Sequence, residues 1–311
     1  MSQCSSPACS CAGTCWLACG GCATAGYCSL ACQRSHWSAH QPACSSATLP
    51  PLLQPYTATF AGETLTVHET VAGQPDHDGS SCPTGAFVWP CAVTLLDLLF
   101  TLAPLPPGLL IDLSAGVGLV SCALAQLCSH SSVLSLDLPS ALPLLQRNLA
   151  PLGLRSTCLA YAWGQPLPPL AQPPPPTLAI ACDLLHCAVR DGLGAELAGT
   201  LAQLATACQH GCLVAWQPRS AQRELDLLAT AAAALPGLVC EPPQRLPGRR
   251  QHRGVGHPEG SIFLPPSLFP EALEGEDEEE ERGAEGSTGV LYTVLRRVDA
   301  PRLTRRNGEA V

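Results

Sequence analysis

The 311-residue chain contains no lysine, and all 16 of its basic residues are arginine. Charged residues make up 13% of the chain, about half of the roughly 25% that is usual in soluble domains. Hydrophobic residues make up 46%, so the chain lacks the polar, charged composition of a disordered protein. Composition and length together predict about two folded domains with a full buried core.

The chain also lacks long apolar segments. No window of about 18 consecutive apolar residues is free of proline and charge, which argues against a membrane-spanning helix. The first residues do not show the basic and then apolar segments of a secretory signal. We therefore expect a protein of the cytoplasm, the nucleus or both, without membrane contact.

A basic surface is missing as well. The net charge is −9, and nine of the 25 acidic residues lie in the segment 271–286. The other 16 acidic residues balance the 16 arginines, so we expect no direct binding of nucleic acid. The run of like charges predicts a solvated, disordered insertion, and docking of a basic partner is the alternative.

Cysteine is abundant at one end, since nine of the 19 cysteines lie in the first 44 residues. Without a secretory signal, such density indicates metal binding rather than disulfides. The spacing is Cys19-x2-Cys22-x5-Cys28-x3-Cys32-x7-His40-x3-Cys44, preceded by Cys4, Cys9, Cys11 and Cys15. Structural zinc requires tetrahedral sets of thiolate and imidazole, so eight such ligands predict two zinc ions. A segment this short needs the metal in order to fold.

The pairs Tyr27-Cys28 and Cys32-Gln33 and the series Trp37-x2-His40-x3-Cys44 resemble a MYND zinc finger. The resemblance implies interleaved sites: Cys19, Cys22, His40 and Cys44 in one, and Cys28 and Cys32 with an upstream pair in the other. We favour Cys4 and Cys9 as that pair, with Cys11 or Cys15 as a possible replacement, and do not expect His36 to be a ligand. MYND fingers bind peptides, often proline-rich ones; a finger that only docks on its neighbouring domain is the alternative.

From about residue 54, predicted strands and helices alternate. A hairpin is expected around Gly62, and buried strands are expected at 108–113, 132–138, 157–163, 177–182, 211–217 and 237–242. Helices are expected at 92–103, 119–128, 141–153 and 222–236, with another after His186 and a last strand at 289–297. This alternation predicts a parallel sheet covered on both faces.

Residues 110–118 read as a strand, a tight turn of small residues and a helix start, and Asp137 ends the next strand. Small turn residues let the backbone approach a cofactor, and such an acid can accept hydrogen bonds from ribose hydroxyls. Either a nicotinamide dehydrogenase or an S-adenosylmethionine methyltransferase fits this pair. The turn lacks the full G-x-G-x-x-G spacing. The final strand at 289–297, after a helix and a strand, suits the class I methyltransferase sheet, in which the last strand inserts antiparallel.

Residues from about 55 to 298 resemble the seven-β-strand protein-lysine methyltransferases, family 16. The resemblance is carried by the segments 85–90, 112–120, 137–139, 162–164 and 183–186 and by Asn148. It implies that Trp89 lies beside the cofactor, that Asp137 holds the ribose and that Trp163 packs near the adenine. The remaining implied cofactor residues are those of the turn and the pocket wall: Asp112, Ser114, Ala115, Gly116, Gly118 and Cys182.

Two departures from the family concern the site. Ser114 replaces the first glycine of the turn, and we expect binding to survive if φ is negative there. His186 stands where the family has an aromatic residue in the Asp183-Leu184-Leu185-His186 motif. As catalytic residues we expect Asp183 to orient a lysine ammonium group and His186 to relay its proton.

The predicted protein is thus an α/β chain: a two-zinc MYND finger at 1–45, a linker at 46–53 and a Rossmann-like class I methyltransferase domain at 54–299. Residues 300–311 are expected to be a flexible tail. The predicted function is S-adenosylmethionine-dependent methylation of lysine on a protein substrate, with the finger as targeting module. The alternatives are a non-catalytic adaptor and a methyltransferase for a small molecule or a non-lysine residue. The glycine turn excludes a SET-domain fold.

Overall fold

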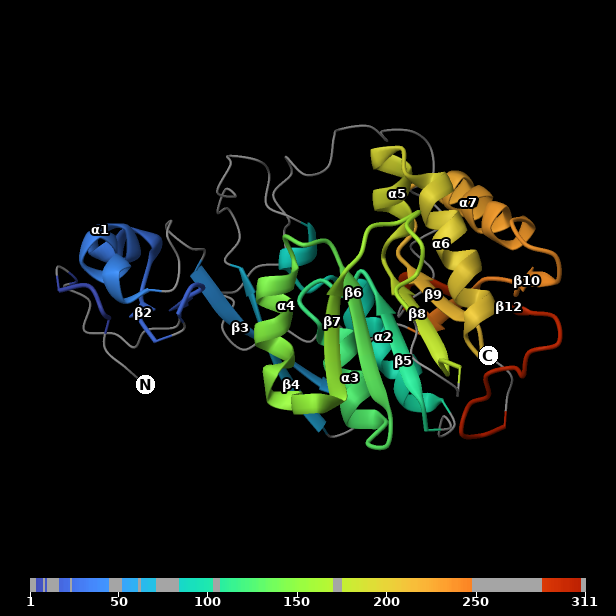
Figure 1. Ribbon diagram of the computed structural model, residues 1–311, viewed down its shortest axis with the longest axis horizontal. Coiled ribbons are helices and arrows are strands. Elements are labelled where there is room, and N and C mark those ends of the chain that lie inside the picture. Colours follow the sequence, from blue (N-terminus) through green and yellow to red (C-terminus); the bar gives the residue numbers. More distant parts are fainter. Residues whose placement is uncertain are drawn as a thin grey trace.

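The computed structural model describes residues 4–7, 9, 17–22, 24–44, 52–60, 63–70, 84–102, 107–169, 175–247 and 287–308 (Figure 1). The acidic segment 271–286 and two of the alternative zinc ligands, Cys11 and Cys15, lie outside the described residues. Within the described part, no helix combines the length and the apolar character that crossing a membrane requires.

The larger sheet has the strand order β10-β12-β9-β8-β5-β6-β7, with β11 paired to β12. Five strands run parallel: β5 (Leu109–Leu113), β6 (Ser132–Asp137), β7 (Ser156–Ala160), β8 (Leu178–Cys182) and β9 (Cys212–Trp216). The last strand, β12 (Ser287–Arg297), is antiparallel to β9, β10 (Leu238–Cys240) and β11 (Gln244–Pro247). The predicted antiparallel insertion of the last strand is confirmed.

Helices cover both faces of this sheet. On one face, α2 (Pro90–Thr101), α3 (Leu119–Leu127) and α4 (Leu142–Leu149) share a core cluster with Leu110 of β5. On the other, α5 (Leu185–Asp191), α6 (Gly194–Ala207) and α7 (Ala221–Ala233) pack on Ile111 and Leu113. Neighbouring residues of one strand thus enter opposite layers, as the alternation of a β-strand requires. The single helix expected after His186 is two helices, because Gly192 adopts a φ of 72° and ends the first.

The finger consists of β1 (Leu17–Cys19), β2 (Gly26–Tyr27), α1 (Leu30–His40) and a 3₁₀ turn at Gln41–Ala43. It lies at one end of the molecule, coloured blue in Figure 1. The predicted hairpin is confirmed as β3 (Leu52–Phe60) and β4 (Glu63–Thr70). Further short 3₁₀ segments are Thr84–Ala86 and Ala150–Arg155.

The finger and the hairpin form one sheet in the order β2-β1-β3-β4. Strand β3 begins at Leu52, inside the predicted linker 46–53, and Leu52 and Leu53 pair with Cys19 and Ala18 of β1. Leu52 is fully buried and belongs to the small core of the finger, with Cys19 and Tyr27. The finger is therefore joined to the hairpin by backbone pairing and not only by the chain between them.

The predicted flexible tail at 300–311 is corrected for residues 300–308. Leu303 is buried, and the backbone N–H of Arg306 donates to the Thr101 carbonyl at 2.8 Å. The Arg306 guanidinium lies 4.5 Å from the centre of the Phe100 ring, and Arg305 donates to the Tyr292 hydroxyl at 2.9 Å. These contacts attach the segment to the C-terminal end of α2 and to β12, which its sequence of scattered arginines did not indicate.

Candidate active site and metal centres

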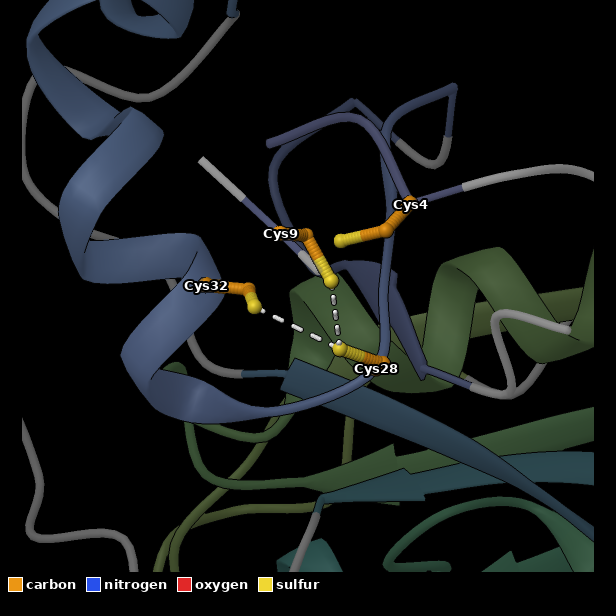
Figure 2. A group of neighbouring side chains, drawn as sticks. All are labelled: Cys4, Cys9, Cys28 and Cys32. Atoms are coloured by element: carbon orange, nitrogen blue, oxygen red, sulfur yellow. Dashed lines mark hydrogen bonds between the residues drawn. The ribbon is translucent and has the colours of Figure 1, made fainter. Parts of the chain in front are cut away.

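One cluster of four thiols brings together the start and the middle of the finger sequence. The Sγ atoms of Cys4, Cys9, Cys28 and Cys32 all lie within 4.8 Å of one another and point toward a common centre (Figure 2). The Sγ atoms of Cys9 and Cys28, and those of Cys28 and Cys32, are 3.3 Å apart. The pair favoured from loop length, Cys4 and Cys9, is the one that the structure places with the other two.

The second cluster contains Cys19, Cys22, His40 and Cys44, also within 4.8 Å of one another. Cys22 Sγ lies 3.4 Å from His40 Nε2, and Cys19 Sγ lies 3.8 Å from Cys44 Sγ. A tetrahedral zinc with Zn–S bonds of about 2.3 Å places its sulfurs about 3.8 Å apart. Both donor sets therefore fit structural zinc, and their ligand pairs alternate along the chain, which ties the finger into one unit.

His36 lies apart from both clusters. Its Nδ1 atom is 3.1 Å from the Tyr27 hydroxyl. Tyr27 is fully buried in the finger core, so this contact gives His36 a packing partner within the finger.

A cavity of about 370 Å³ lies at the carboxyl ends of β5, β6 and β8. In an open parallel sheet, this edge is where ligands bind. Ten of the eleven residues predicted for the cofactor and for catalysis line it: Trp89, Asp112, Ser114, Ala115, Gly116, Asp137, Trp163, Cys182, Asp183 and His186. The lining also includes Leu138 and Arg219, which the sequence did not single out.

Gly118, the eleventh residue, has a different role. It is the N-cap of α3 with a φ of 85°, and a Cβ atom there would lie 2.8 Å from Leu145 Cδ1 of α4. The absence of a side chain thus lets α4 pack against the start of α3. The sequence placed Gly118 with the cofactor residues, whereas the structure places it in the packing beneath the turn.

The backbone at Ser114 departs from the expectation of a negative φ. Its φ is 56°, in the left-handed region that costs an ordinary residue roughly 1–2 kcal/mol. The Trp163 indole Nε1–H donates to Ser114 Oγ at 3.0 Å, a bond that glycine would not offer. The serine therefore adopts a backbone conformation that favours glycine, and its hydroxyl fixes the Trp163 ring at the cavity.

Asp137 is the last residue of β6, as expected, and it is buried. Its Oδ2 accepts the Gly116 N–H and its Oδ1 accepts the Leu138 N–H, both at 2.7 Å. Burial raises the pKa of Asp137, and these two N–H groups oppose the rise. Each carboxylate oxygen has a further lone pair, so the group can still accept bonds from a diol.

The donor set of this cavity fits the adenosyl part of S-adenosylmethionine. Asp137 supplies acceptors for the ribose hydroxyls, and Leu138 and Trp163 supply apolar and aromatic walls. When bound, the cofactor supplies an electrophilic methyl group on a sulfonium sulfur. The protein supplies the alignment of the acceptor with that methyl group.

Asp112 is buried beneath the turn. The Ser121 hydroxyl donates to Asp112 Oδ2 at 2.5 Å and lies 2.7 Å from the Ser135 hydroxyl. Burial raises the pKa of Asp112 from 3.8 to about 7, with the Asp137 charge adding to the rise. The folded protein thus binds this proton more tightly than the unfolded chain does.

The sign of the resulting pH dependence follows from that difference. Between about pH 4 and pH 7 the folded state carries the proton and the unfolded state has lost it, so wild-type stability falls as the pH rises. We expect the free energy of unfolding of wild type, relative to Asp112→Asn, to decrease across this range and to level off above about pH 7. Urea unfolding of both proteins at several pH values measures the difference. The zinc ligands contribute the same pH dependence to both proteins, so their contribution cancels. A difference that is independent of pH, or that rises with it, contradicts the assignment.

On the acceptor side of the cavity, Asp183 is paired with Arg219. The guanidinium Nη1 and Nη2 atoms donate to Oδ1 and Oδ2, each at 3.0 Å, and the Gln217 N–H donates to Oδ1 at 3.1 Å. The Arg219 guanidinium also lies 5.7 Å from the centre of the Trp89 ring. The charge of Asp183 is therefore already balanced by an arginine. This corrects the expectation that Asp183 alone receives a lysine ammonium group.

His186 lies in the first turn of α5. Burial lowers its pKa, and the nearby charges of Arg219 and Arg190 lower it further. The imidazole is therefore neutral near pH 7. A neutral imidazole can accept a proton, so His186 keeps the chemical property on which its predicted role depends.

The comparisons with known proteins agree with this geometry. Residues 4–44 match the sequence model of the MYND finger, and residues 76–230 match that of a family described as lysine methyltransferase. No curated protein matches the chain.

Solved methyltransferases are similar in part. Mitomycin 7-O-methyltransferase MmcR aligns over 66% of this chain and 53% of its own, with 15% identity and a TM-score of 0.41. Precorrin-6y C5,15-methyltransferase from Geobacter metallireducens aligns over 73% and 97%, with 13% identity and a TM-score of 0.39. The fibrillarin pre-rRNA processing protein of Methanococcus jannaschii aligns over 64% and 84%, with 13% identity and a TM-score of 0.37. This chain thus spans about half the length of the mitomycin enzyme, and no substrate follows from likenesses this distant.

Sheet order, glycine turn and the acid at the end of β6 are those of the class I S-adenosylmethionine-dependent methyltransferases. The chain joins this domain, of which residues 76–230 match the lysine methyltransferase model, to an N-terminal MYND finger with two clusters that fit zinc.

Proposed function

We propose that the protein transfers a methyl group from S-adenosylmethionine to a lysine side chain of another protein. The observation that carries the proposal is the family match over 76–230, in which Asp183 and the histidine at the family's aromatic position, His186, both lie at the cavity. The chain itself contains no lysine, so the substrate lysine must come from a different protein.

The site supports an amine as the methyl acceptor. Only the lone pair of a neutral amine attacks the methyl group, so a lysine must first lose a proton. Arg219 and Asp183 form a neutral pair in the cavity wall, and His186 offers a basic nitrogen near them. A paired arginine does not repel an incoming ammonium group as an unpaired one would.

The finger supplies a second surface for protein recognition. In line with the family to which it belongs, we propose that it binds a proline-rich peptide of the substrate or of a partner protein. Trp37 supports this proposal: it lies half-buried on α1, with its ring centre 6.0 Å from that of His40, and leaves part of an aromatic surface exposed.

Labelling of a cell lysate with methyl-labelled S-adenosylmethionine tests the protein substrate. We expect the purified enzyme to label one or a few protein bands other than its own. Label that is found only in small molecules would contradict the protein substrate, and absence of cofactor binding would indicate an adaptor.

Asp183→Asn should separate the acceptor side from the cofactor side. Asparagine keeps the shape but leaves the Arg219 charge uncompensated beside the substrate amine. We expect kcat/KM to fall at least about tenfold, about 1.4 kcal/mol, while the cofactor Kd changes little. Calorimetric titration and a rate assay measure the two effects, with Asp226→Asn on the exposed side of α7 as control. Full activity in Asp183→Asn would remove this residue from the acceptor site.

A further inference from the structure

Resting on the proposed function, we propose that Glu224 is a positioning residue that orients His186, so that His186 Nε2 accepts the proton of the substrate amine. The proposal keeps His186 as the group that receives the amine proton. It assigns a role to a buried carboxylate that the family motif does not include.

The orientation of His186 carries the first part. Its Nδ1 atom is buried and has no hydrogen-bond partner among the described residues. The side chain as a whole is 28% exposed and lines the cavity, so the ring turns its other edge, which bears Nε2, toward the open side. The nearest carboxylate oxygen to Nδ1 is Glu224 Oε1, at 3.9 Å.

The carboxylate of Glu224 is held by backbone N–H groups of the two residues that precede α7. Its side chain is fully buried in the first turn of α7. The Arg219 N–H donates to both carboxylate oxygens, at 3.2 and 3.3 Å, and the Ser220 N–H donates to Oε1 at 3.2 Å. The Glu224 carboxylate, 3.9 Å from Nδ1, lies beyond hydrogen-bond distance, and its fixed negative charge favours the tautomer that carries the proton on Nδ1.

Asp183, the motif carboxylate on the acceptor side of the cavity, is not available for this task. Both oxygens of Asp183 accept hydrogen bonds from Arg219, whose guanidinium is fixed between Asp183 and the Trp89 ring. Asp183 and Glu224 thus have separate partners, although the backbone and side chain of Arg219 connect them. This division explains how the site functions with histidine in place of the family aromatic residue.

Other charges act on His186 from each neighbouring element. Arg219 and Asp183 follow the ends of β9 and β8, and Arg190 and Asp191 lie on its own helix. Helix α6 contributes apolar contacts to the same core, and its Glu196 is exposed and lies against Gly164. The Cys187 thiol next in sequence has a pKa raised by burial and stays neutral.

The proton balance is simple. The N–H bond of the substrate ammonium breaks, and the proton moves to His186 Nε2 while its electron pair stays on the amine nitrogen. That nitrogen then forms the bond to the methyl group, and the sulfur keeps the electrons of the bond that breaks. The imidazolium, stabilised through Nδ1–H by Glu224, returns its proton to water at the exposed ring edge.

The test is the pH profile of methyl transfer by full-length Glu224→Gln, with the substrate protein identified by lysate labelling. We expect kcat to fall at least about tenfold with KM little changed, a modest part of the 10²–10⁴-fold that a positioned base supplies. Loss of the charge also lowers the pKa of His186, so the acidic limb of the profile should move to lower pH. Glu224→Asp, which keeps the charge, should restore part of the rate.

The control is Glu241→Gln, which removes the carboxylate that binds Arg296 at 2.6 Å on the β10–β12 edge. It should leave the pH profile of methyl transfer unchanged, while lowering the stability by about as much as Glu224→Gln does. A Glu224→Gln enzyme that is folded and active with the wild-type profile would overturn the proposal and leave the methyltransferase function intact. If Glu224→Gln does not fold, Glu224→Asp is the test: its shorter side chain moves the charge away from Nδ1, and a wild-type kcat in that variant would overturn the proposal. A wild type that labels no lysine would refute the proposed function instead.

Discussion

The Cys22→Ser variant of the full-length protein should lose the zinc ion of the second cluster and, with it, the folded finger. Cys22 is one of four ligand residues whose donor atoms lie within 4.8 Å of one another, and the finger core contains few side chains besides the ligands. Zinc binding supplies roughly 10–16 kcal/mol in zinc-finger peptides, far more than so small a core can replace. Metal analysis should show about one zinc fewer per chain, and limited proteolysis should cut the finger.

The effect should extend to the methyltransferase domain. Cys19, another ligand of this cluster, pairs with Leu52 of β3, and Gln54 of β3 donates to Glu69 Oε1 at 2.9 Å. Glu69 Oε2 in turn accepts the N–H of Val88, next to Trp89 in the cavity wall, at 3.0 Å. We therefore expect a lower melting temperature for the whole chain and not only for the finger.

The matched control is His36→Gln, which changes a histidine on the same helix as the ligand His40 but outside both clusters. It should keep both zinc ions. Full-length protein is the appropriate sample, because a fragment that ends before Leu52 lacks the strand that pairs with β1. Unchanged zinc content in Cys22→Ser would contradict the ligand set.

Asp137→Ala should weaken S-adenosylmethionine binding at least about tenfold. Hydrogen bonds from ribose hydroxyls to a carboxylate are worth roughly 1.5–3 kcal/mol each, and each tenfold in Kd corresponds to about 1.4 kcal/mol. Calorimetric titration of the folded variant measures the change. An unchanged Kd would show that the ribose binds elsewhere.

This variant also needs a stability measurement, because Asp137 accepts the N–H groups of Gly116 and Leu138. Alanine leaves both donors without this acceptor, so we expect a lower melting temperature. Asp137→Asn keeps the shape and one acceptor oxygen, and should lose affinity with a smaller loss of stability. Parallel losses of affinity in both variants would then report the carboxylate and not a damaged turn.

The sequence predicted those features that depend on local pattern. The strand and helix alternation predicted the parallel sheet, and the resemblance to class I methyltransferases implied its antiparallel last strand. The resemblance to MYND fingers implied the two interleaved clusters that the structure assembles. Cys4 and Cys9 were favoured because the loop from Cys9 to Cys19 then has the length usual in MYND fingers.

The sequence did not predict the features that depend on tertiary contacts. The positive φ at Ser114 accompanies a hydrogen bond from Trp163, 49 residues away in sequence. The partner of Asp183 is Arg219, 36 residues away, with no motif that links the two. The pairing of Leu52 with Cys19 turned part of an expected linker into a strand. The break between α5 and α6 did have a local signal, Gly192 and Gly194, which the helical composition around it outweighed.

The most direct test of the central claim is the identity of the methylated amino acid. Protein labelled in a lysate by the purified enzyme and methyl-labelled S-adenosylmethionine is hydrolysed, and the labelled amino acids are separated. We expect the label in methylated lysine, in bands other than the lysine-free enzyme itself, and we expect Asp137→Ala to reduce it when S-adenosylmethionine is at or below the wild-type Kd. Label in another amino acid, or label that Asp137→Ala leaves undiminished at that concentration, would contradict the account.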